Sequence, residues 1–113
     1  MLETKQWKKK LINKLMTNKQ EEILALLIIN KGGSFGNSYG LCKMLAWKFK
    51  IINCNAIIDS IHKKEYVSCA DIKGLEYFSL TIQGKKIIEE NKTELIEFLK
   101  KEYPSELIII ENL

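Results

Sequence analysis

Apolar residues recur at helical spacing in several stretches of the chain. The first stretch predicts a helix capped by Thr4, with one apolar side formed by Trp7, Leu11, Ile12, Leu15 and Met16. Residues 17–20 fit a capping box, which predicts the start of a second helix. That helix contains a fully apolar run, residues 23–29, and Gly32 and Gly33 end it. A helix without a polar side is expected at the centre of the core.

A glycine-rich segment, residues 33–40, follows the second helix. It lacks both the glycine order and the Lys-Ser/Thr ending of phosphate-binding loops, so it does not predict a nucleotide site. We expect a short strand around Phe35 and then a helix capped by Asn37 or Ser38. The inward positions of that helix are Leu41, Met44 and Leu45, with Trp47 as a further candidate.

A later apolar stripe predicts a short helix that ends at two lysines. Its members are Cys54, Ile57, Ile58 and Ile61. From Tyr66 the apolar period changes to two, so residues 66–70 and 75–80 predict two strands. Gly74 can supply the positive φ that a hairpin between them needs.

The final helix is expected to begin at Thr81, whose hydroxyl can cap it, and to end before Pro104. Gly84 lies in its first turn. Because glycine inside a helix costs about 1 kcal/mol relative to alanine, its presence indicates close packing there. The pattern leaves open a break near Asn91. It also leaves open whether the apolar tail Leu107–Ile110 forms a short strand or an arm that reaches a second subunit.

The 113 residues are enough for one compact domain. We expect an N-terminal helix over residues 1–17, a core over 18–91, and a C-terminal helix with the apolar tail over 92–113. The longest apolar run has seven residues, too few to cross a membrane, and the N-terminus lacks the apolar stretch of a signal peptide.

The charge is unevenly distributed along the chain. Residues 1–19 carry six lysines and one glutamate, whereas residues 76–113 carry five lysines and eight glutamates. This pattern is compatible with one basic face toward an anionic partner and equally with solvated helix faces. All eighteen basic residues are lysine, so no side chain can form the bidentate fork with which arginine reads guanine.

The three cysteines are odd in number and lack a close pair. They are typical of reduced, mostly buried thiols in a cytoplasmic protein. Together with His62 they could supply zinc ligands, but spacings of 12, 8 and 7 residues do not resemble a zinc knuckle. The sequence therefore predicts no cofactor.

The order of these elements resembles that of a winged helix-turn-helix domain, an α+β fold with a three-helix core and a β-hairpin wing. "EILALLIINKGG" resembles its first core helix, and "SYGLCKMLAWKFKIINCNAIIDSIHKKEYV" resembles the helix-turn-helix that runs into the wing. "YFSLTIQGKKIIEE" resembles the segment with a Leu-Thr-x-x-Gly signature in PadR- and MarR-like regulators. The likeness covers residues 20 to 91. Glu65 departs from it, because that family pattern usually has glycine before the wing.

The resemblance implies that residues 54–63 form a recognition helix for the major groove of duplex DNA. Asparagine can pair with adenine, which favours A·T-rich sites, and lysines can neutralise phosphates. The expected DNA-binding residues are Lys48, Lys50, Asn53, Asn55, Ser60, Lys63, Lys64 and Lys73. Segment 51–75 has three acids and three lysines, which is a weak charge signal for this role.

The helices outside the shared core suggest a homodimer, as in regulators of this kind. Their apolar residues could instead complete the core of one subunit. The main expectation is thus a small, dimeric, sequence-specific transcriptional regulator in the cytoplasm. One alternative is a winged-helix module that binds proteins without binding DNA. Another is a repressor that responds to a small molecule. Nothing in the sequence predicts an enzyme, because its one histidine has no partner motif.

Overall fold

The computed structural model describes residues 16–106. Its elements, in order, are α2 (Asn18–Lys31), η1 (Gly33–Phe35), α3 (Ser38–Phe49), α4 (Cys54–Lys63), β1 (Val67–Ile72), β2 (Leu75–Leu80) and α5 (Ile82–Glu102). The predicted helix over 1–17, except its last two residues, and the tail Leu107–Ile110 lie outside the described residues. In the described part, no helix is long and apolar enough to cross a membrane.

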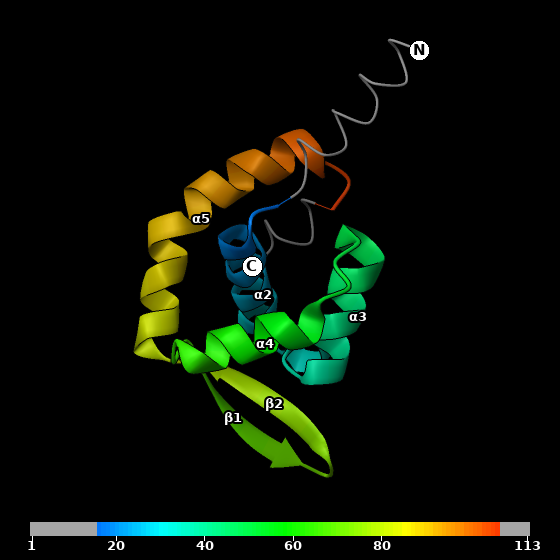
Figure 1. Ribbon diagram of the computed structural model, residues 1–113, viewed down its shortest axis with the longest axis vertical. Helices are drawn as coiled ribbons and strands as arrows, with labels where there is room; N and C mark the ends of the chain where they lie inside the picture. Colours follow the sequence, from blue (N-terminus) through cyan, green and yellow to red (C-terminus); the bar gives the residue numbers. More distant parts are fainter. Residues whose placement is uncertain (1–15, 107–113) are drawn as a thin grey trace.

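Helix α2 forms the centre of the fold. It packs against α3, α4 and α5, while the hairpin projects from the helices at one end (Figure 1). All residues from Ile23 to Ile29 are at most 3% exposed, as the apolar run predicts. The capping box is also confirmed, because the Gln20 backbone N–H donates to the Thr17 hydroxyl and the Thr17 backbone N–H donates to the Gln20 side chain.

The hairpin is antiparallel and pairs Val67 with Leu80 at its base and Ile72 with Leu75 at its tip. The two turn residues, Lys73 and Gly74, have φ of 55° and 82°. Positive φ at both positions is the type I′ geometry that matches the twist of a two-residue hairpin. Strand β1 extends two residues beyond its predicted end at Ala70.

The predicted strand around Phe35 is wrong. Residues 33–35 form a single 3₁₀ turn, and the extended pairing occurs two residues later, as an isolated bridge between Asn37 and Tyr77. The Asn37 side chain accepts from the Gly40 N–H and thereby caps α3, as predicted. The apolar pattern also makes Trp47 a candidate for the core, but this residue is 69% exposed and lies outside the core.

The start of α5 explains both Thr81 and Gly84. The Thr81 hydroxyl accepts the Gly84 N–H at 3.0 Å and donates to the Glu65 carbonyl at 2.6 Å. A Cβ on Gly84 would lie 2.1 Å from the Tyr66 carbonyl oxygen. Only glycine allows this approach without a shift of the backbone, so the predicted close packing is confirmed.

Helix α5 is continuous over 21 residues. The helix does not end near Asn91, although α5 bends along its length (Figure 1), and the Asn91 side-chain amide donates to the Ile87 carbonyl at 2.8 Å. The boundary drawn between residues 91 and 92 therefore lies inside one element. Leu99 is fully buried, and Tyr103 packs against Phe49 of α3 with ring centroids 5.6 Å apart. Leu99 and Tyr103 therefore pack within the core of the chain itself.

The cysteine prediction is also wrong. Cys42 of α3 and Cys54 of α4 form a disulfide with their Cα atoms 5.4 Å apart, and Cys69 is exposed. A spacing of twelve residues gave no signal of this pair, because the turn between two packed helices brings the cysteines together. Disulfides are more common in oxidising compartments, so the cytoplasmic location loses its support from reduced thiols and stays a prediction.

Over residues 16–106 the chain is thus an α+β structure of four α-helices and one two-stranded antiparallel hairpin. This much of the predicted fold class is confirmed.

Candidate nucleic-acid interface

Helix α4 has one buried side and two polar sides. Its apolar stripe packs into the core as predicted, with Cys54, Ile57, Ile58 and Ile61 each at most 8% exposed. The polar residues therefore have to lie along the edges of this stripe or opposite it. They divide into a group next to α2 and a group that faces away from the body.

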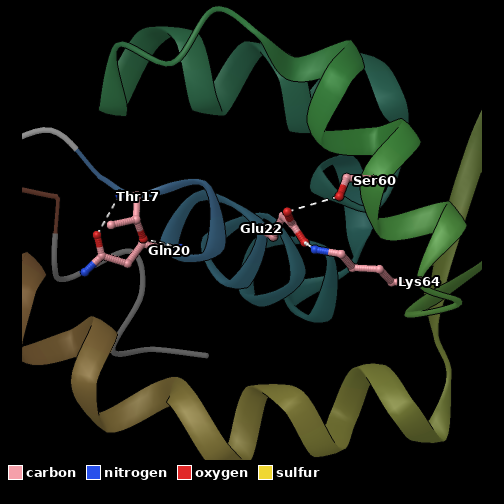
Figure 2. A network of polar contacts seen from close by, with 5 residues as sticks. All are labelled: Thr17, Gln20, Glu22, Ser60 and Lys64. Atoms are coloured by element: carbon pink, nitrogen blue, oxygen red, sulfur yellow. Dashed lines mark hydrogen bonds and ion pairs between the residues drawn. The ribbon is translucent and has the colours of Figure 1, made fainter.

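The group next to α2 is built around Glu22. This carboxylate is only 7% exposed, and it accepts from the Ser60 hydroxyl at 3.1 Å and from the Lys64 ammonium at 2.8 Å (Figure 2). Figure 2 shows Ser60 and Lys64 directed from α4 and its C-terminal end toward Glu22 on α2. A buried carboxylate needs such partners, because burial without them would be costly.

This contact changes the ionisation of Lys64. Its hydrogen bond to Glu22 raises the pKa of the Lys64 ammonium above its ordinary value, against a smaller opposing effect of burial. The charged form is therefore favoured in the folded protein.

Three predicted DNA-binding residues belong to this inner group. The sequence predicts Ser60 as a DNA-binding residue, whereas its hydroxyl donates to Glu22 and therefore faces α2. The Lys64 ammonium forms an ion pair with the same carboxylate. Asn53 is at the N-cap position of α4 without a side-chain bond to the helix, and its amide lies 3.5 Å from a carboxylate oxygen of Glu21. The three face an acidic edge of α2.

The outer group contains Asn55 and Lys63, which are exposed, together with Asp59. Asn55 lines an open groove between α3, α4 and the start of β2. The other residues of this groove are Ser38, Tyr39, Cys42, Lys43 and Leu75. Lys48 lines an adjoining groove of about 420 Å³ along α3, which shares Tyr39, Lys43 and Leu75 with the first. The structure thus brings Asn55 and Lys48 to neighbouring parts of one surface.

Sequence reasoning missed the aromatic part of this surface. Tyr39 and Trp47 are 67% and 69% exposed, and the Lys43 ammonium lies 5.9 Å and 5.2 Å from their ring centroids. These distances fit cation–π contacts. The spacing of four residues between them was a usable signal, because it places all three on one side of a helix, away from Leu41 and Leu45.

The other two predicted DNA-binding residues, Lys50 and Lys73, both have a left-handed backbone conformation. Lys50 ends α3 with φ 59°, and its ammonium lies 3.4 Å from the Trp47 carbonyl. Lys73 is exposed in the hairpin turn. Lys50 is therefore near the aromatic part of the surface, whereas Lys73 is at the tip of the hairpin.

A separate cluster of potential metal ligands lies on one face of the hairpin, next to the end of α4. Among the described residues, His62, Cys69 and Glu76 place one ligand atom each within 4.8 Å of one another. Burial, with a further effect of the neighbouring Glu76 carboxylate, raises the pKa of the Cys69 thiol to about 11.

Comparisons of the chain with protein-family models, curated proteins and solved structures found no match. The resemblance to PadR- and MarR-like regulators consequently stays a prediction.

Proposed function

We propose that the chain is a winged-helix protein that binds duplex DNA through the outer side of α4. Two features support the fold. The first is the order of the elements along the chain, which is α2, the Asn37–Tyr77 bridge, α3, α4 and the hairpin. The second is the packing of α4 across α2. In such a domain α4 enters the major groove and the hairpin contacts the adjacent backbone.

The observation that carries the proposal is the division of α4. Its apolar stripe and its inner polar residues are fixed to the body, whereas Asn55 and Lys63 remain exposed and unused by it. Asn55 can read adenine, and Lys63 can neutralise a phosphate. Lys48 and Lys73 supply further positive charge on either side. The interface we propose is therefore smaller than the sequence predicted, because it omits Asn53, Ser60 and Lys64.

We further propose a dimeric transcriptional regulator, since two α4 helices one DNA turn apart would read a two-fold symmetric site. Leu99 and Tyr103 are used within one subunit, so the dimer contact must come from other residues. Sedimentation equilibrium of the full chain tests this directly. A monomer at the concentrations that saturate DNA would exclude the dimeric form of the proposal.

The DNA-binding proposal is tested by fluorescence anisotropy with an A·T-rich duplex over a range of salt concentrations. Each phosphate contact contributes a slope of about −0.9 in log affinity against log salt. Lys63→Ala should reduce the slope by about one contact, and Asn55→Ala should weaken binding mainly to A·T-rich sequence. Lys100→Ala, an exposed lysine on α5, is the matched control. Equal salt slopes for the Lys63 and Lys100 variants would exclude α4 as the interface.

A protein-binding module is the second candidate, because Tyr39 and Trp47 expose aromatic surface beside an apolar-lined groove. Aromatic residues are enriched at protein interfaces. This candidate predicts no salt-dependent DNA binding by the wild-type chain. It also predicts a protein partner in pull-downs whose capture is lost in Trp47→Ala and kept in Lys63→Ala.

A further inference from the structure

Three side chains from three consecutive elements converge beside the hairpin. His62 is in the last turn of α4, Cys69 is in β1 and Glu76 is in β2. The strand register explains how the last two meet. Cys69 pairs with Phe78, and Glu76 is two residues before Phe78 on β2, so Cys69 and Glu76 lie on one face of the hairpin. His62 reaches the same face, where its ring meets Phe78 edge-on at 6.1 Å.

The two partners of His62 approach the same ring nitrogen. The Cys69 Sγ lies 2.8 Å from Nε2, and the Glu76 Oε2 lies 3.8 Å from that atom. A thiol–imidazole–carboxylate relay for nucleophilic catalysis needs the acid on the opposite nitrogen, which is not the case here. One possible ligand atom from each of the three side chains instead lies near a common point, which is what a shared metal ion requires.

The distances between these atoms are close to those that such an ion requires. Zinc bonds to sulfur, nitrogen and carboxylate oxygen are about 2.0–2.3 Å long, so tetrahedral ligand atoms lie about 3.3–3.8 Å apart. The observed ligand atoms are all within 4.8 Å of one another, and one pair is closer than 3 Å. Changes of about 1 Å in partly exposed side chains would complete the geometry, since the His62 and Glu76 side chains are 37% and 42% exposed.

We propose that His62, Cys69 and Glu76 bind a divalent transition-metal ion of the zinc class. The mixture of thiolate, imidazole and carboxylate suits zinc or cobalt and does not suit magnesium or calcium, which take oxygen ligands. Three protein ligands leave a fourth position for water or for a group of another molecule. The ion would join the end of α4 to both strands of the hairpin.

The structure also explains why residue spacing is a weak signal of this site. Cys42 and Cys54 form a disulfide and are not free to bind an ion, and the third ligand is the carboxylate of Glu76. The ligand spacing, with six residues between His62 and Cys69 and six between Cys69 and Glu76, becomes meaningful only once the hairpin register is known.

The test is a cobalt titration of the purified full chain under non-reducing conditions, in which Cys69 is its one free thiol. We expect one ion per chain, with the near-ultraviolet absorption of a cobalt–thiolate bond. Zinc should displace the cobalt in competition with a chromophoric chelator. Cys69→Ser should abolish the absorption, and His62→Gln and Glu76→Gln should each weaken affinity by at least about tenfold, because loss of even an outer-sphere partner costs about 10–100-fold.

Asp71→Asn is the matched control. Asp71 is on β1 and shares the hairpin face of Cys69 and Glu76, and its side chain bonds the Gly74 N–H in a way that asparagine can reproduce. This variant should bind cobalt as the wild type does. Circular dichroism confirms that each variant is folded. Absence of a cobalt–thiolate band in the wild type, or equal affinity of the wild type, Cys69→Ser and His62→Gln, would overturn the proposal.

Discussion

The two polar sides of α4 look alike in sequence and differ in structure. On the inner side, Ser60 and Lys64 are bound to the buried Glu22 of α2 (Figure 2). On the outer side, Asn55 and Lys63 are exposed. The lysines are adjacent in the chain, yet one belongs to the fold and the other is available to a partner. A helical wheel locates the buried stripe, but it does not tell which polar neighbour of that stripe another element will use.

The largest expected effect concerns the attachment of α4 to α3. Closing a loop of about this length with a disulfide stabilises a protein by about 2–3 kcal/mol. The double substitution Cys42→Ser/Cys54→Ser should therefore lower the free energy of unfolding in urea by about that amount. Cys69→Ser, which leaves the disulfide intact, should have little effect. If reductant did not shift the wild-type midpoint, the disulfide would not form in solution.

The next effect separates the two lysines directly. Lys64→Met leaves the Glu22 carboxylate without its cation. Because the Lys64 side chain is 48% exposed, solvent screens the ion pair, and the free energy of unfolding should fall by about 1–2 kcal/mol, less than for a fully buried pair. Lys63→Met should leave the free energy of unfolding unchanged. Thermal and urea unfolding of both variants measure the difference. Equal destabilisation would show that the inner and outer sides are not distinct.

A smaller effect should appear at alkaline pH. The Lys64 pKa is raised in the folded state, so its stabilising contribution is complete below the unfolded value of about 10.4 and is lost as pH rises through the folded pKa. The raised pKa values of Tyr103 and Cys69 act in the same direction. Unfolding free energies between pH 9 and pH 11 should therefore fall less steeply in Lys64→Met than in wild type. Identical slopes would contradict the assignment to Lys64.

The smallest effect tests the junction between α4 and the hairpin. Glu65 has φ 59°, a conformation that disfavours every residue with a Cβ. Glu65→Gly should raise the free energy of unfolding by about 0.5 kcal/mol, because relief of this conformation exceeds the added entropy of the unfolded chain. Glu90→Gly, inside α5, should have the opposite sign and cost about 1 kcal/mol. A destabilised Glu65→Gly would show that the Glu65 side chain has a role of its own.

Local signals in the sequence predicted much of the fold. The capping box at Thr17, the stripe of α4 and the close approach at Gly84 each follow from the chemistry of a few neighbouring residues. Glu65 is instructive in the same way. Glu65 stands where the winged-helix pattern usually has glycine, and its backbone has the positive φ that glycine favours.

The candidate sites were harder to predict, because they depend on contacts between distant residues. Ser60 and Glu22 are 38 positions apart, and Lys64 and Glu22 are 42 apart. The Cys42–Cys54 bond and the meeting of Cys69 with Glu76 likewise depend on helix packing and strand register. Periodicity within one element contains no information about these pairs.

The most direct test of the account is a titration of the isotope-labelled chain with an A·T-rich duplex, followed by NMR of backbone amides. If the outer side of α4 binds DNA, the largest shifts should occur at Asn55, Asp59 and Lys63 and at the hairpin tip around Lys73. Amides of α5 around Lys100 should hardly move. Shifts centred on α5, or a spectrum that the duplex leaves unchanged, would contradict the proposal that the outer side of α4 binds DNA.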